Sequence, residues 1–95
     1  MKISGIGFIY MITCVITNKI YVGSTQDVDE RWLNYRSLNC KKQNKIYNNL
    51  CKYGVENHAF EVIWCGDIND MFQYEAMIGI YYNVLDRDVG LNLAL

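Results

Sequence analysis

Glu75 lies where an amphipathic helix would ordinarily carry an apolar side chain. It falls between Met71 and Ile78 on the apolar stripe of a helix predicted over residues 69–82. A carboxylate on such a stripe faces the core or a cleft, and leaving it there without a cationic partner is costly. Glu75 is therefore a candidate metal ligand; the alternative is a residue at the stripe's edge that reaches solvent.

Arg31 raises the same question on an earlier predicted helix. It shares a face with Val28, Tyr35 and Leu38, so its stem should pack on apolar neighbours while its guanidinium stands where that face ends. A guanidinium that faces a cleft can hold a phosphate through two parallel hydrogen bonds. The alternatives are an exposed arginine or an ion-pair partner for Glu75.

Tyr10 and Tyr21 differ from the chain's other tyrosines because one lies on each strand of a predicted β-hairpin. In an antiparallel pair of this length the two rings could lie near each other on one face. Their hydroxyls would then be available for proton transfer or phosphate contact. Gly23 follows closely and would let the backbone approach a ligand or a packed element.

The elements that must position these residues begin with that hairpin. Residues 7–13 and 20–24 are rich in β-branched and aromatic side chains, and Thr17, Asn18 and Lys19 supply turn chemistry between them. Asp27, with Glu30 three residues later, has the form of a capping box. It predicts a helix that runs through Tyr35 to Leu38.

The rest of the chain predicts two further helices and one further strand. Asn44 can cap the second helix, which would turn Ile46, Tyr47, Leu50 and Cys51 inward before Gly54 ends it. Residues 59–65 indicate a third strand. The expected fold is α/β (α+β): one domain over residues 1–95, with a small three-stranded antiparallel sheet flanked by three helices in the order ββααβα.

Positive charge is concentrated in one segment although the net charge is only −1. No acidic residue interrupts the stretch from Arg31 to Lys52, so one face could be basic and bind a polyanion. Solubilising charges on exposed helix faces are the alternative. The basic residues of this stretch are Arg31, Arg36, Lys41, Lys42, Lys45 and Lys52, of which the three middle lysines are candidate phosphate contacts.

The four cysteines are widely spaced, and the chain has one histidine. Without a Cys-x-x-Cys pair a zinc site or a thiol redox centre is not favoured. No signal peptide or membrane-length apolar run is present, so we expect free, mostly buried thiols rather than a disulfide framework. The expectation is an intracellular protein of a reducing compartment, cytoplasm or nucleus, neither secreted nor membrane-bound.

The order of these features resembles the catalytic domain of the GIY-YIG endonuclease family, which includes homing endonucleases. Phe8-Ile9-Tyr10 matches the first signature, although Phe8 replaces its glycine unless Gly7 serves with a one-residue slip. Tyr21-Val22-Gly23 matches the second, with valine for isoleucine, and Tyr35 stands where some members carry histidine. The resemblance continues through Arg31, Lys52-Tyr53-Gly54, Glu75 and Gly90-Leu91-Asn92.

The resemblance implies a metal-dependent endonuclease that cuts DNA to leave 5′-phosphate and 3′-hydroxyl ends. Glu75 would hold one divalent ion, Mg²⁺ or Mn²⁺. Arg31 would offset phosphoryl charge, Tyr10 would take the proton from the attacking water, and Tyr21 and Tyr35 would orient water or phosphate. Two further active-site positions, expected to bind substrate, are Gly23 and Asn92.

Two questions stay open at this point. A nucleic-acid-binding module with the same fold and no turnover is the main alternative, and a carboxylate facing a polyanion argues against it. Sequence preference is not readable from a chain of 95 residues. We expect another domain or a partner protein to supply it, and the oligomeric state is left undetermined.

Overall fold

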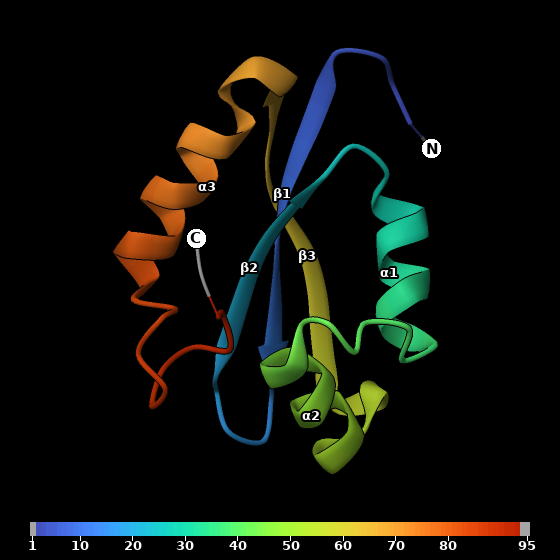
Figure 1. The fold of residues 1–95 in the computed structure, drawn as a ribbon, viewed down its shortest axis with the longest axis vertical. Helices are drawn as coiled ribbons and strands as arrows, with labels where there is room; N and C mark the ends of the chain where they lie inside the picture. The colour runs from blue at the N-terminus through green and yellow to red at the C-terminus, as the bar shows by residue number, and fades with distance from the viewer. Residues whose placement is uncertain (1, 94–95) are drawn as a thin grey trace.

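A computed structural model describes residues 2–93 and contains the predicted series of elements (Figure 1). Three strands and three helices follow one another in the order ββααβα, with a short 3-10 turn before the last strand. The elements are β1 (Ile6–Cys14), β2 (Ile20–Thr25), α1 (Val28–Arg36), α2 (Asn44–Tyr53), the 3-10 turn (Val55–Asn57), β3 (His58–Asp67) and α3 (Ile68–Tyr82). The predicted α+β architecture is confirmed.

The sheet has the strand order β2-β1-β3, and both pairings are antiparallel. In the β1–β2 register Tyr10 lies opposite Gly23, and Ile12 lies opposite Tyr21. Because side chains two residues apart on a strand share a face, Tyr10 and Tyr21 come to the same side of the sheet. β2 is an edge strand, so residues near its end are accessible from both faces of the sheet.

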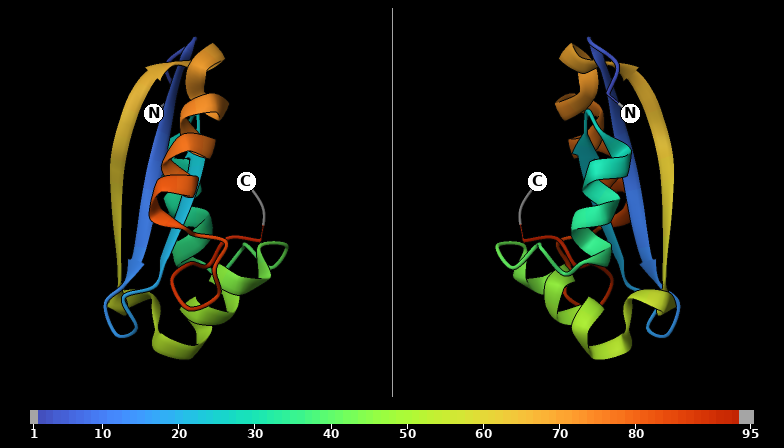
Figure 2. Two further views of the ribbon diagram at one scale, coloured as in Figure 1. Left: turned by 90° about the vertical axis from the view of Figure 1, so that its left-hand side faces the viewer. Right: turned by 90° about the vertical axis from the view of Figure 1, so that its right-hand side faces the viewer.

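Each face of the sheet has its own core. On one side Tyr10, Ile12 and Tyr21 pack with buried residues of α1 and α2. On the other side Ile9, Met11 and Val22 pack against α3 and Val84. Figure 2 shows that the sheet separates the two helices: α3 lies in front of the strands in the left view, and α1 lies in front of them in the right view. The domain therefore has three layers, and residues at the start of α3 line one groove with residues of α1.

Helix ends follow local capping chemistry, with two departures from the sequence predictions. Asp27 caps α1 by accepting from the Glu30 amide, as expected. The helix ends at Arg36, however, because Leu38 adopts a left-handed conformation with φ of 61°. Asn44 is not the cap of α2 but its first helical residue, and Gln43 takes the cap position.

The cysteines are less buried than predicted. All four are free thiols, but only Cys14 is buried; Cys51 and Cys65 are exposed. Cys51 was expected to point inward on α2, whereas the core-facing residues of that helix are Ile46, Asn49 and Leu50. The physical reason is helical geometry: Ile46 and Leu50 pack in the core with Ile12, and Cys51 lies about 100° further around the helix from Leu50, on an exposed flank.

The segment after α3 closes part of the open edge of β2. Backbone hydrogen bonds join Ile20 N to Val89 O (3.0 Å) and Leu91 N to Ile20 O (2.8 Å). The Asn92 side chain then continues the pairing, because its Oδ1 accepts from Val22 N (2.9 Å) and its Nδ2 donates to Val22 O (2.7 Å). No helix within residues 2–93 is both long and apolar enough to cross a membrane.

Candidate active site

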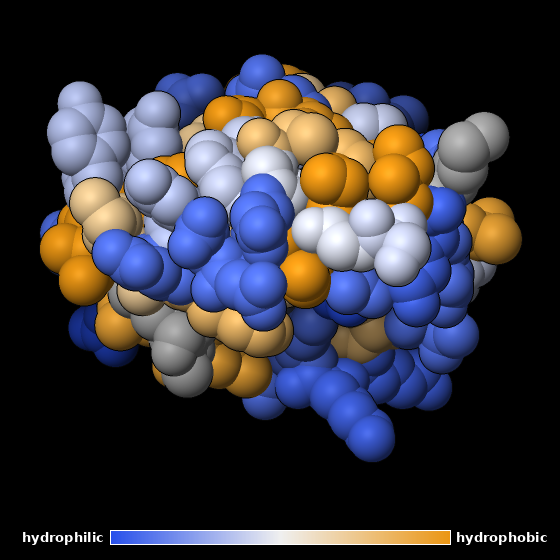
Figure 3. All heavy atoms as spheres, turned by 90° about the horizontal axis from the view of Figure 1, so that it is seen from above, coloured by the Kyte–Doolittle hydropathy of each residue, from blue (hydrophilic) through white to orange (hydrophobic). Residues whose placement is uncertain are grey.

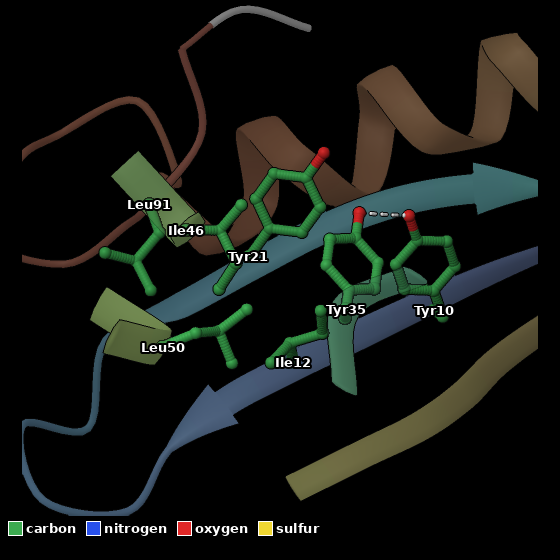
Figure 4. Close-up of a cluster of buried hydrophobic side chains, with 7 residues drawn as sticks. All are labelled: Tyr10, Ile12, Tyr21, Tyr35, Ile46, Leu50 and Leu91. Carbon is green, nitrogen blue, oxygen red and sulfur yellow. Dashed lines mark hydrogen bonds between the residues drawn. The ribbon is translucent and has the colours of Figure 1, made fainter. Parts of the chain in front are cut away.

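Three tyrosines from three elements meet beside the sheet. The ring centroids of Tyr10 and Tyr21 are 6.4 Å apart, those of Tyr10 and Tyr35 are 5.9 Å apart, and those of Tyr21 and Tyr35 are 6.0 Å apart. Figure 4 shows the hydroxyls of Tyr10 and Tyr35 turned toward each other, with Ile12 and Leu50 on the apolar side of the rings. The two hairpin tyrosines are neighbours, as the strand pattern predicted.

A chain of hydrogen bonds runs through two of these hydroxyls. Arg31 Nη1 donates to Tyr10 Oη at 3.3 Å, and the Tyr10 and Tyr35 hydroxyls are 2.7 Å apart. Tyr35 Oη in turn donates to Gln43 Oε1 at 2.8 Å. Since each phenol has one proton and Tyr35 gives its own to Gln43, Tyr10 must donate to Tyr35. The Tyr10 oxygen, which accepts from Arg31, keeps a lone pair for another donor.

Burial decides the protonation state of the tyrosines. Desolvation, strengthened by Tyr21, raises the pKa of Tyr10 well above its ordinary value, and the hydrogen bond with Tyr35 and the charge of Arg31 oppose that rise only in part. Desolvation also raises the pKa of Tyr21 and of Tyr35. The phenols of the free protein are therefore neutral near pH 7.

Arg31 keeps its charge in this setting. Partial burial lowers the pKa of its guanidinium, but interactions with Tyr10 and Tyr35 outweigh burial and leave that pKa raised. Its side chain is half-buried, and it lines an open groove. A permanently charged, partly desolvated fork is well suited to bind a phosphate.

Glu75 reaches the site from the opposite face of the sheet. Its Oε1 accepts from Ser24 Oγ at 2.9 Å, and its side chain is half-buried. Desolvation raises the pKa of the Glu75 carboxyl, against the lowering effects of the Ser24 hydrogen bond and of the Arg31 charge. Of the alternatives left open by the sequence, Glu75 is neither a solvent-exposed residue nor a direct ion-pair partner of Arg31, whose donor contact is with Tyr10.

Gly23 and Ser24 show how β2 brings the two sides together. A Cβ at Gly23 would collide with the Tyr10 ring and hydroxyl, so the glycine is required by the packing of Tyr10. The next side chain, Ser24, points to the other face and contacts Glu75. The alternation of an edge strand thus places Tyr10 and Glu75 on either side of one short stretch of backbone.

A groove that Ser24 lines, but Tyr10, Gly23 and Glu75 do not, has a volume of about 1040 Å³. Figure 3 looks onto the upper end of the molecule in Figure 1, where hydrophilic side chains gather on the side of α1. A volume of this size exceeds that of one phosphate and suits an extended ligand. Residues of the β2 end, α1, the following loop and the start of α3 line it, among them Ser24, Arg31, Tyr35, Lys41, Lys42 and Gln43.

Of the predicted substrate-binding residues, only Lys41 and Lys42 line the groove; Gly23 is buried under the Tyr10 ring, and Lys45 and Asn92 lie elsewhere. Lys45 Nζ donates to the Asn92 carbonyl at 3.4 Å, and the Asn92 amide is occupied by Val22. Neither is among the described residues that line the groove. In this structure both residues hold the segment after α3 against β2.

Sequence reasoning missed two residues that contact the site. Ser24 was given no role, although strand alternation from Val22 would have placed it on the α3 face with Glu75. Gln43 gave no sequence signal, because its partner Tyr35 lies in another helix and the loop geometry decides their approach.

A divalent cation would have to depend on few protein ligands. Throughout residues 2–93, no three His, Cys, Asp or Glu side chains come together. Mg²⁺ is commonly bound through one or two carboxylates with water and phosphate oxygens completing its shell. The half-buried Glu75 carboxylate, held by Ser24 at one oxygen, fits that donor set.

Comparison with known proteins adds one finding. A family model described as the GIY-YIG catalytic domain matches residues 6–78. The matched range includes the tyrosine cluster, Arg31 and Glu75, whereas Asn92 lies beyond it. Comparison with curated proteins and with solved structures gave no match.

Proposed function

Because the chain belongs to the GIY-YIG catalytic domain family, a family of nucleases that act on DNA, we propose that it is a metal-dependent DNA endonuclease. The observation that carries the proposal is that Arg31 contacts Tyr10 while its charge also acts on Glu75, which Ser24 of β2 holds on the other side of the strand. A cation, a hydroxyl with a spare lone pair and a carboxylate are the groups that phosphodiester hydrolysis needs.

Arg31 would bind the scissile phosphate from the groove. Its fork can donate to a non-bridging oxygen while one nitrogen stays on Tyr10. Charge on the phosphoryl oxygens grows in the transition state, so a positioned guanidinium contributes more to the reaction than to holding a long DNA.

Tyr10 would orient the attacking water and take its proton. The Tyr10 oxygen lies beside Arg31, so a water bound to it would be next to a phosphate held there. Because burial raises the pKa of Tyr10, the phenolate that can take this proton is scarce at neutral pH, and it becomes more abundant as pH rises. The rate should therefore increase with pH through the neutral range. Tyr21 and Tyr35 would orient water or phosphate from the same side.

Glu75 would hold one Mg²⁺ or Mn²⁺ ion, with Ser24 fixing the direction of its carboxylate. The bound ion would offset charge on the phosphate and on the departing 3′ oxygen. The new bond joins the water oxygen to phosphorus, and the bond that breaks joins phosphorus to the 3′ oxygen. The products would carry 5′-phosphate and 3′-hydroxyl ends.

Incubation of supercoiled plasmid with the protein tests this function. We expect nicked and linear DNA with Mg²⁺ and intact plasmid with EDTA, and a ligase should reseal the nicks because the ends are 5′-phosphate and 3′-hydroxyl. Plasmid that is retarded in a gel shift but stays supercoiled in both Mg²⁺ and Mn²⁺ would leave a non-catalytic nucleic-acid-binding module as the function.

The DNA footprint should depend on Lys41 and Lys42, because they line the groove and Lys45 does not. Each phosphate contact contributes about 0.9 to the slope of log affinity against log salt concentration. Replacing Lys41 and Lys42 by alanine should therefore flatten this slope by about two units, measured by fluorescence anisotropy in Ca²⁺. The matched control, alanine at Lys45 and Lys52, should leave the slope nearly unchanged. Equal effects of the two pairs would place the footprint elsewhere.

A further inference from the structure

Gln43 contacts the tyrosine cluster through Tyr35 and lines the groove beside Lys41 and Lys42. Its Oε1 accepts from Tyr35 at 2.8 Å, and Tyr35 is 2.7 Å from Tyr10. The amide therefore ends a chain whose other end is the Arg31 guanidinium. The role argued below for Gln43 rests on the proposed function, in which Tyr10 takes the proton of the attacking water.

The position of Gln43 favours this contact over a local one. A residue at a helix N-cap normally uses its side chain to accept from a backbone amide of the first turn. Among the described residues, no side-chain hydrogen bond from Gln43 caps α2. The side chain crosses instead to Tyr35 on α1, while Gln43 also lines the groove. Gln43 is half-buried.

An amide differs from other polar groups because it presents both an acceptor and a donor at one end of a rotatable bond. While Tyr10 is neutral, protons point from Tyr10 to Tyr35 and from Tyr35 to Gln43 Oε1. Tyr10 is itself fully buried, so a hydroxide ion that takes its proton would have to enter from the groove beside Arg31 and would leave as water. Once that proton is lost, the Tyr10 oxygen needs donors, and Arg31 and Tyr35 can supply them. Tyr35 then gives its proton to the Tyr10 oxygen, so the Gln43 amide can stabilise Tyr35 only by donating to it, not by accepting from it.

We propose that Gln43 is a positioning residue whose amide sets the direction of the hydrogen bonds between Tyr35 and Tyr10. Oε1 accepts from Tyr35 while Tyr10 is neutral, and Nε2 donates to Tyr35 after Tyr10 has lost its proton. When the phenolate takes a proton from the attacking water, Tyr10 is neutral again and the chain returns to its first direction. No group is oxidised or reduced, and each proton is accounted for.

Other ionisable groups also act on the cluster and must be held constant in any test. Arg31 on α1 faces Tyr10, and Tyr21 on β2 faces both other rings. Glu75 on α3 and Cys40 after α1 raise the pKa of Tyr21. Gln43 is neutral, unlike these ionisable neighbours. Its replacement by a carboxylate therefore changes both the charge beside Tyr35 and the ability to donate a hydrogen bond to it.

Gln43→Glu tests the proposal, because a carboxylate accepts from Tyr35 but cannot donate to it. Single-turnover cleavage at saturating protein should fall about tenfold at pH 7 and recover at higher pH, with the rate–pH curve displaced upward by about one unit. Gln43→Met, whose thioether is only a weak acceptor and cannot donate, should displace the curve less. Asn34→Asp is the matched charge control, since Asn34 lines the same groove from α1.

A second measurement needs neither metal nor activity. Difluorotyrosine in place of Tyr10 has a more acidic phenol, which brings its ionisation into a measurable range and provides a fluorine NMR signal. Gln43→Glu should raise the pH at which this signal titrates in the metal-free protein, and Asn34→Asp should raise it by less than a third as much.

The outcomes separate two failures. If Gln43→Glu shifts the titration and the rate profile no more than Asn34→Asp does, the directional role of Gln43 is wrong. A loss of rate that is equal at every pH would also overturn it, because it would indicate a structural contact only. If the parent protein does not cut DNA, the proposed function fails, and the fluorine titration still decides the role of Gln43.

Discussion

Replacing Glu75 by glutamine should slow DNA cleavage by about 1,000-fold, equivalent to roughly 4 kcal/mol in the barrier. Glutamine keeps the size of the side chain and can still accept from Ser24, but it removes the negative charge that a divalent cation needs. Single-turnover cleavage in Mg²⁺ measures the loss. Mg²⁺ should also raise the melting temperature of the parent and leave that of the variant unchanged.

Stability provides the control for this substitution. Burial holds the pKa of Glu75 above its ordinary value, so folding favours the protonated form. Such a group stabilises the fold at pH below its unfolded pKa, and this contribution disappears as pH rises through the folded pKa. At neutral pH the charged carboxylate therefore opposes folding, and Glu75→Gln should melt at the same or a higher temperature.

Glu61→Gln makes the same chemical change at an exposed position on β3 and should leave cleavage and melting unchanged. Parental cleavage rates for Glu75→Gln in Mg²⁺ would show that Glu75 is not the ligand. A large fall in its melting temperature would instead show that the carboxylate supports the fold.

Arg31→Ala should slow cleavage by about 100-fold to 1,000-fold, roughly 3 to 4 kcal/mol, while DNA affinity changes by a small factor. The guanidinium is one of several basic groups along the groove, so its share of ground-state binding is small. In the transition state it would face the growing phosphoryl charge directly. Its loss also removes the donor to Tyr10 and the charge that lowers the pKa of Tyr10.

Single-turnover rates in Mg²⁺ and binding titrations in Ca²⁺ on one duplex separate these effects. Arg36→Ala, on the exposed last turn of α1, is the matched control and should leave the cleavage rate unchanged. Arg31→Lys keeps the charge but not the planar fork, so it should recover only part of the rate. If Arg31→Ala loses affinity while its rate at saturating protein survives, Arg31 is a binding residue and its transition-state role is wrong.

The sequence by itself determined the elements and the residue types that the site requires. Alternation over residues 7–13 and 20–24 predicted the hairpin, and Asp27 predicted the start of α1. The helical period placed Glu75 on an inward stripe, and its half-buried carboxylate agrees. These features are local, because strand alternation, helix period and capping each depend on residues only a few positions apart. The family resemblance was likewise carried by short motifs and was confirmed over residues 6–78.

Only the tertiary structure decided which of these residues meet. The contacts of Ser24 with Glu75 and of Val22 with Asn92 join residues 51 and 70 positions apart, and Gln43 reaches Tyr35 across a loop. Such contacts depend on strand order, on the edge position of β2 and on how each helix docks, none of which leaves a period in the sequence. The same dependence assigned Lys45 to Asn92 instead of the groove. It also turned the Tyr10 ring onto Gly23, because the β1–β2 register sets those two residues opposite each other.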